Sequence, residues 1–191
     1  DNGIVFDMMI EGGLISIKTN IRSVNLIENL TGAILVARVF GIGWDKIVEK
    51  CESLILPEGT LSIFKTQNGI TVIDDSYNAS PSGFNAALDF LAEFKGKRKF
   101  VVTTGVIELG KESDKIHKAI GSKIDRVADY LLLRNKDFEK PLKEGMLNKS
   151  KLVLLSDPCR IIDYLKRKVE SGDVVLIEGK LPMVKNYFKS S

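Results

Sequence analysis

Residues 72–82 read VIDDSYNASPS, in which an apolar strand leads through a dense polar segment into the start of a helix. Part of this pattern is helix capping, because Ser80 or Ser82 suits an N-cap and Pro81 suits the first turn. Asp75 would also favour the positive end of that helix. Capping accounts for one or two of these polar residues but not for all of them. The segment is therefore also a candidate ligand site.

Strands and helices alternate on the C-terminal side of this segment. Short apolar runs predict strands, and apolar residues at helical spacing predict amphipathic helices. The predicted strands are 100–103, 130–133, 152–155 and 174–177, and the predicted helices are 82–94, 112–126 and 159–170. Continuous apolar strands separated by amphipathic helices are typical of a mostly parallel sheet with helices on both faces. We therefore predict an α/β fold for this part.

A different organisation precedes residue 57. Alternating apolar residues over 4–21, with a turn at Glu11-Gly12-Gly13, predict two or three short strands. Helices are predicted over 26–40 and 45–53. The expected buried positions of the first helix are Leu26, Leu30, Ala33, Ile34, Ala37 and Val39, and those on the apolar side of the second are Trp44, Ile47 and Val48.

Pro57-Glu58-Gly59 separates this block from a predicted hairpin over 61–65 and 71–74. We therefore expect two parts, residues 1–56 and 57–191, with a hinge between them.

The composition limits the class of function. The 191 residues are 44% hydrophobic and 28% charged, as in a globular protein, and the net charge is only +3. Basic residues are interspersed with acidic ones, which argues against nucleic-acid or membrane partners. Cys51, Cys159 and a single histidine have no metal-ligand spacing, so we expect no metal site here. We expect both cysteines to be buried, in a protein of the reducing cytoplasm.

The first residues, Asp1-Asn2-Gly3, include neither an initiator methionine nor a signal-like segment. We therefore expect the chain to be part of a longer protein.

Two more strand ends carry unusual residues, at the edge where parallel α/β sheets bind ligands. TTGVIELG, residues 103–110, places Gly105 where backbone amides can approach a ligand, although an ordinary loop is an equal alternative. EGKLPM, residues 178–183, offers Lys180 to an anion, although a lone loop lysine is usually only solvated. His117 lies in a predicted helix without an acidic or cysteine partner, which favours packing or surface over a general base.

Together these segments resemble the Mur ligases, ATP-dependent enzymes of peptidoglycan precursor synthesis. Residues 72–81 are very similar to the DDSYNANP motif of the branch that adds D-alanyl-D-alanine, whereas related folate ligases carry DGAHNP. Residues 29–42 resemble the long helix that ends the family's central ATPase domain. The family's ELG-x-E-S-x-x-x-H-x-x-x-G stretch is matched by Glu108-Leu109-Gly110, Glu112, Ser113, His117 and Gly121.

The resemblance implies a Rossmann-like C-terminal domain over 57–191, preceded by the tail of the central ATPase domain over 1–56. It implies contacts to the adenosine of ATP from Asn29, Asp75, Tyr77 and Asn78. Asn29 would reach the adenine, and the Asp75 carboxylate would accept charge-assisted hydrogen bonds from the ribose. It implies that the peptide or dipeptide substrate lies near Gly105, Glu108 and Lys180.

The implied enzyme is a cytoplasmic, monomeric ligase that uses ATP and Mg²⁺. Its implied partners are a UDP-linked muramoyl peptide and an amino acid or dipeptide, which it joins through an acyl phosphate. The family's phosphate-binding loop, magnesium ligands and carbamylated lysine have no counterpart in these residues. We therefore expect the chain to be inactive alone, because phosphoryl transfer depends on such groups.

Three segments depart from the family pattern. Gly59-Thr60 replaces a usual Gly-Arg, and residues 23–26, SVNL, replace G-x-H-N. EGKL, residues 178–181, replaces K-G-S-R. These departures leave two alternatives open, a Mur-like ligase for another polymer or amino acid, and a degenerate module without catalysis.

Overall fold

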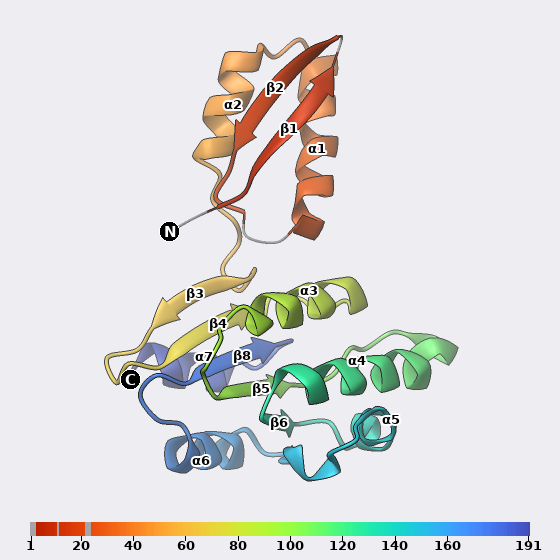
Figure 1. The fold of residues 1–191 in the computed structure, drawn as a ribbon, viewed down its shortest axis with the longest axis vertical. Helices are drawn as coiled ribbons and strands as arrows, with labels where there is room; N and C mark the ends of the chain where they lie inside the picture. Colours follow the sequence, from red (N-terminus) through yellow and green to blue (C-terminus); the bar gives the residue numbers. More distant parts are fainter. Residues whose placement is uncertain (1–2, 11, 22–23) are drawn as a thin grey trace. The chain divides into compact units, whose positions relative to one another are not determined.

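The computed structural model describes residues 3–10, 12–21 and 24–191. The chain forms two compact units, Asp1–Pro57 and Glu58–Ser191 (Figure 1). Within the described residues, no helix has the length and apolar character needed to cross a bilayer.

The first unit contains a β-hairpin and two helices. β1 (Val5–Ile10) pairs antiparallel with β2 (Gly13–Lys18), and α1 (Val24–Val39) and α2 (Trp44–Glu52) follow. The hairpin and both helices are therefore confirmed. The core of this unit consists of Met8, Ile17, Ile21, Leu30, Ile34, Ile47 and Cys51.

Two predicted core positions of α1 are wrong. Ala33 is exposed, and Val39 is 86% exposed. The helix buries Leu30 and Ile34, which lie one turn apart on the same side. Because α1 is apolar on nearly every side, its periodicity did not single out that face.

The second unit is built on a sheet of six strands in the order β3-β4-β8-β5-β6-β7. β3 (Ser62–Lys65) is antiparallel to β4, and all other pairs are parallel. The remaining strands are β4 (Thr71–Asp75), β5 (Lys99–Thr103), β6 (Tyr130–Leu133), β7 (Leu152–Leu154) and β8 (Val174–Glu178). The predicted α/β class and its mostly parallel sheet are confirmed.

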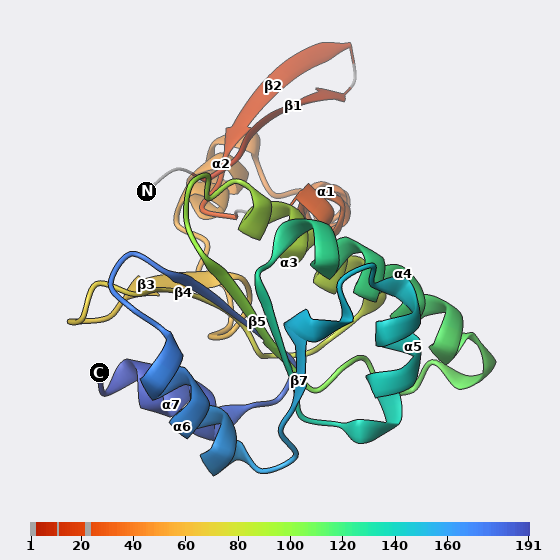
Figure 2. The same cartoon turned by 60° about the horizontal axis from the view of Figure 1, so that its bottom comes forward.

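Helices cover both faces of this sheet (Figure 2). The helices on one face are α3 (Pro81–Ala92), α4 (Ser113–Val127) and α5 (Glu139–Gly145), and those on the other are α6 (Pro158–Lys168) and α7 (Pro182–Lys189). Neighbouring residues of one strand enter different cores: Val101 packs with α3 and α4, whereas Val102 packs with α6 and α7.

Helices α5 and α7 and three short 3₁₀ helices were not predicted from the sequence. These are η1 (Gly110–Glu112), η2 (Lys136–Phe138) and η3 (Lys149–Lys151). Both missed α-helices are short and carry a proline in the first turn, at Pro141 and Pro182. Proline is tolerated there because the first-turn N–H has no partner within the helix.

Cys159 was also predicted to be buried, and this is wrong. It is exposed in the first turn of α6, whereas Cys51 is buried as expected. The buried stripe of α6 runs through Ile161 and Leu165, four residues apart. Cys159 lies two residues before that stripe, on the solvent side of the helix.

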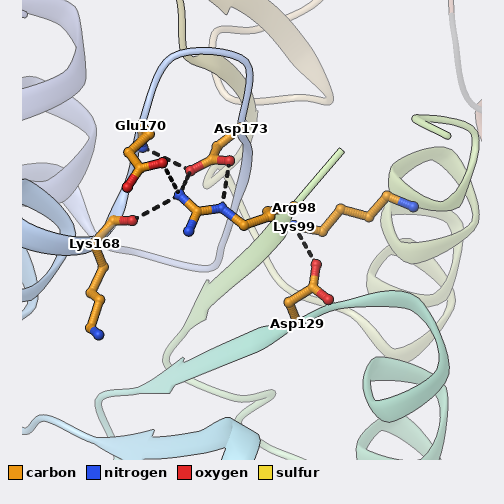
Figure 3. Close-up of polar contacts among 6 residues, drawn as sticks. All are labelled: Arg98, Lys99, Asp129, Lys168, Glu170 and Asp173. Atoms are coloured by element: carbon orange, nitrogen blue, oxygen red, sulfur yellow. Dashed lines mark hydrogen bonds and ion pairs between the residues drawn. The ribbon is translucent and has the colours of Figure 1, made fainter. Parts of the chain in front are cut away.

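Charged residues join the amino ends of β5 and β8 (Figure 3). Arg98 donates two hydrogen bonds to the buried carboxylate of Asp173, from Nε at 3.0 Å and from Nη2 at 2.7 Å. The backbone N–H of Glu170 donates to the same carboxylate at 2.7 Å. Arg98 and Asp173 immediately precede their strands, so this cluster fastens the edge of the sheet opposite the strand carboxyl ends.

Candidate functional site

Three polar side chains lie together at the carboxyl edge of the sheet. β8 lies between β4 and β5, and its last residue, Glu178, pairs in register with Asp75 on one side and Thr103 on the other. Residues far apart in sequence therefore meet at the edge where ligands of such sheets bind.

The two acids of the motif have different environments. Asp74 is buried, and its carboxylate lies 2.9 Å from Nζ of Lys185 on α7. It also accepts hydrogen bonds from the hydroxyl and the backbone N–H of Ser76, the latter at 3.2 Å. Asp74 is therefore held by structural contacts, which leaves Asp75 as the acid available to a ligand.

Asp75 is half-buried and fixed by the loop before β3. The backbone N–H of Leu61 donates to its Oδ1 at 2.9 Å, from a residue with the unusual φ of +44°. The carbonyl of Gly59 accepts from the N–H of Tyr77 at 3.0 Å, and a Cβ on Gly59 would lie 3.0 Å from that nitrogen. The loop at 59–61, where Thr60 replaces the family's usual arginine, thus lies directly against the motif.

Glu178 completes the site, although it was not among the acids predicted from the sequence to bind a ligand. It is fully buried, and neither carboxylate oxygen has a hydrogen-bond donor among the described residues. Burial raises the pKa of Glu178 well above its ordinary range, and the charge of Asp75 raises it further. The available signal was an ionisable residue at the end of the apolar strand VVLI, 174–177.

Of the residues after Asp75, some are exposed to solvent and others form the start of α3. Tyr77 is 62% exposed and Asn78 is exposed, so both side chains are accessible to a ligand. Ser80 caps α3 by accepting from the N–H of Gly83 at 3.0 Å, with Pro81 in the first turn. The predicted helix start is confirmed with Ser80 as the cap.

The loop after β5 uses its amides internally, contrary to the expectation for Gly105. The N–H of Gly105 donates to Oγ1 of Thr103 at 2.9 Å, and that of Val106 donates to Nε2 of His117 at 3.2 Å. Gly105 has a φ of +77°, and a Cβ there would lie 2.3 Å from the ring of Phe138. Its glycine is required by packing, and these two amides are not directed at a ligand.

His117 is a buried structural residue. Because its Nε2 accepts from Val106, its Nδ1 carries the proton and donates to the carbonyl of Ser113 at 2.8 Å. Its ring stacks on Phe138 with centroids 4.0 Å apart. Burial lowers the pKa of His117, which favours the neutral ring. The packing interpretation is confirmed over that of a general base.

The neutral state of His117 predicts a loss of stability in acid. The folded pKa lies below the ordinary 6.5, so the native state binds fewer protons than the unfolded chain. The contribution of neutral His117 to the free energy of unfolding is fully present above pH 6.5. It falls as the pH drops below 6.5 toward the folded pKa, by at most about 1.4 kcal/mol per pH unit. Thermal unfolding of wild type and His117→Gln at several pH values measures this. Equal pH dependence in both proteins would contradict it.

The other predicted site residues lie on exposed positions. Glu108 is exposed with a left-handed φ of +64°, and Lys180 is exposed directly after Gly179. Asn29 is exposed on α1 of the first unit. Ser23, part of the altered segment 23–26, lies outside the described residues. Among the described residues, no three His, Cys, Asp or Glu side chains cluster closely enough to hold a metal ion.

Comparisons with known proteins identify the family. Residues 61–181 match the model of the Mur ligase, glutamate ligase domain. The UDP-N-acetylmuramoyl-tripeptide–D-alanyl-D-alanine ligase of Bacillus subtilis is 28% identical over 163 residues, 82% of this chain and 35% of that protein. The ligase of the same name from Synechocystis is 25% identical over 86% of this chain and 36% of its own length. The chain thus spans about a third of these relatives.

Solved structures share the fold. The MurF ligase of Thermotoga maritima, in complex with ADP, matches 97% of this chain and 43% of its own, with a TM-score of 0.76 and 24% identity. A pseudomurein peptide ligase type C from Methanothermus fervidus matches 97% of this chain and 40% of its own, with a TM-score of 0.76 and 18% identity. With the matched family model covering most of its residues, the chain belongs to the Mur ligase family.

Proposed function

We propose that this chain is the C-terminal part of an ATP-dependent amide ligase that adds D-alanyl-D-alanine to a UDP-N-acetylmuramoyl tripeptide. The names of the Bacillus subtilis and Synechocystis relatives support this reaction. The ligase would activate the terminal carboxylate of the precursor as an acyl phosphate, which the amine of the dipeptide attacks to form the amide. We further propose that the enzyme is a cytoplasmic monomer.

The observation that carries the proposal is the half-buried Asp75 at the carboxyl edge of the sheet. Leu61 holds its Oδ1 from the backbone, so the carboxylate is oriented before a ligand arrives. An oriented carboxylate suits two ribose hydroxyls, because hydrogen bonds to a charged acceptor are the stronger kind. Tyr77 and Asn78 would line the same nucleotide site, and Asn29 would contact the adenine.

The two units correspond to different proposed parts of the ligase. Residues 1–56 would be the tail of the central ATPase domain and residues 57–191 the C-terminal domain, a division supported by the boundary between Pro57 and Glu58. The described residues hold no acidic or histidine cluster that fits Mg²⁺. We therefore assign the magnesium ligands and the phosphate loop to the remaining two thirds of the relatives' length.

The test is an assay of the intact protein that contains this chain. We expect phosphate release from ATP that requires both the UDP-linked tripeptide and D-alanyl-D-alanine, with the amide product identified by mass spectrometry. Omitting either substrate is the control. If the protein forms an amide at the expense of ATP only from other substrates, and not from this dipeptide and this tripeptide, the proposal is refuted.

A second candidate, a Mur-like ligase for another amine or polymer, is favoured by the altered segment 178–181. Glu178 is fully buried and Leu181 is 2% exposed, so Lys180 is the side chain that this segment presents to solvent. Gly105 and Glu108 lie on the loop after β5, the strand beside β8, and would be near the same substrate. The same assay with a panel of amino acids and dipeptides distinguishes the candidates by which amine supports turnover.

A further inference from the structure

If Glu178 and Asp75 are both ionised, neither carboxylate can donate a hydrogen bond to the other. The two residues are partners in the parallel register of β4 and β8, and Glu178 is fully buried. With both carboxylates charged, neither oxygen of Glu178 has a donor among the described residues. As register partners on neighbouring strands, the two side chains lie on the same face of the sheet, so two acceptors would be adjacent. A buried polar group without a partner is costly, and a buried unpaired charge costs more.

A single proton on the pair removes both the unpaired buried charge and the missing hydrogen bond. Like charges at such a contact cannot both be stable, so one carboxyl of a close pair keeps its proton. Asp75 already accepts from the N–H of Leu61, which favours its charged form, whereas Glu178 has no such donor. The proton therefore belongs on Glu178, whose O–H then donates a hydrogen bond to the Asp75 carboxylate.

We propose that Glu178 is a positioning residue: as a neutral carboxylic acid it donates a hydrogen bond to Asp75 and fixes that carboxylate for nucleotide ribose. Leu61 and Glu178 then hold Asp75 from two sides. This inference rests on the proposed nucleotide site. It also explains why an acid is tolerated where the family pattern has a lysine, since a neutral acid is a hydrogen-bond donor as well.

In the part of the chain that the structure describes, the nearby charged groups provide no other partner for Glu178. Asp74, the preceding residue of β4, is paired with Lys185 of α7. Lys180 is exposed after β8, and His117 on α4 is neutral and donates to the carbonyl of Ser113. Burial and the charge of Asp75 raise the pKa of Glu178 well above its ordinary range, which agrees with a proton on Glu178. Burial also raises the pKa of Asp75, as does the charge of Asp74, while the hydrogen bonds from Leu61 and Glu178 oppose that rise.

The positioning role predicts a bell-shaped pH dependence of nucleotide affinity. In acid, Asp75 is protonated and loses its acceptor charge. In alkali, Glu178 loses its proton, and the repulsion between two carboxylates disturbs Asp75. Affinity should fall by up to about tenfold per pH unit above the upper apparent pKa of the pair, the limit for loss of one proton.

The first experiment follows the carboxyl carbons of the 191-residue chain by ¹³C NMR across a pH titration. We expect the resonance of Glu178 to titrate well above the range of an ordinary glutamate. Glu178→Gln should leave the titration of Asp75 close to that of wild type, because glutamine donates a hydrogen bond as the neutral acid does. If Glu178 titrates as an ordinary glutamate, the proton is absent and the proposal is overturned.

The second experiment measures the Kd of ATP for the intact protein across pH in wild type, Glu178→Gln and Glu178→Leu. Glutamine donates at every pH, so that variant should lose the alkaline decline and keep the acid one. Leucine provides no donor, so that variant should bind more weakly at neutral pH. Because the nucleotide titrates identically in all three proteins, differences between them belong to position 178.

The outcomes separate this inference from the proposed function. An unchanged alkaline decline in Glu178→Gln, or full neutral affinity in Glu178→Leu, overturns the positioning role while ATP binding stands. If wild type binds no ATP at any pH, the nucleotide site and the positioning role both fail, and the carbon titration still decides the shared proton.

Discussion

Asp75→Asn in the intact protein is expected to raise the KM for ATP by about 10- to 100-fold, because hydrogen bonds to a charged acceptor contribute about 1.5–3 kcal/mol. Asparagine keeps the oxygen that accepts from the N–H of Leu61, so the loop before β3 should stay in place. Steady-state kinetics at several ATP concentrations measure the effect, and thermal unfolding checks that the fold is unchanged.

Asp74→Asn is the matched control, one residue away on the same strand. Asp74 is paired with Lys185 and Ser76 and is buried, so losing its charge should lower the free energy of unfolding by about 1–3 kcal/mol. The KM for ATP of the folded protein should change little. If Asp75→Asn leaves the KM at the wild-type value, Asp75 does not bind the nucleotide.

Gly121→Ala is expected to lower the free energy of unfolding of the second unit by about 3 kcal/mol, at the upper end of overpacking costs. Gly121 lies in α4, where an added Cβ would be 2.2 Å from the carbonyl oxygen of Leu142 on α5. A Cβ on Gly145 of α5 would in turn lie 1.9 Å from the carbonyl oxygen of Lys118. The two backbones touch, so neither helix can yield without moving the other.

Gly32→Ala provides the control for helix propensity. Gly32 lies in α1 with no atom within 4 Å of an added Cβ, so alanine should stabilise the first unit by about 0.5–1 kcal/mol. Denaturant unfolding followed separately for each unit measures both variants. A Gly121→Ala variant as stable as wild type would show that α4 and α5 do not pack backbone to backbone.

The glycine explains part of the family-like stretch 108–121. The spacing from His117 to Gly121 is one helical turn, so both residues lie on the same side of α4. His117 holds the loop after β5 through Val106, and Gly121 admits α5. These two positions of the family-like stretch are explained by packing.

Local sequence determined the parallel sheet and the longer helices that cover it, α3, α4 and α6. Apolar runs such as 174–177 and the capped segment at Ser80 are features of neighbouring residues, and these predictions are confirmed. The short helices α5 and α7 were missed because each is too brief for a periodic pattern. The buried face of α1 was misplaced because its apolar residues surround the helix.

Tertiary structure alone decided which polar groups meet. Asp74 and Asp75 are adjacent and chemically identical, yet the strand alternation directs one toward Lys185 and the other toward Leu61 and Glu178. Glu178 joins Asp75 across about a hundred residues, through a strand order in which the last strand lies between the second and third. Such register depends on how two cores pack across the whole sheet, and no local pattern carries that information.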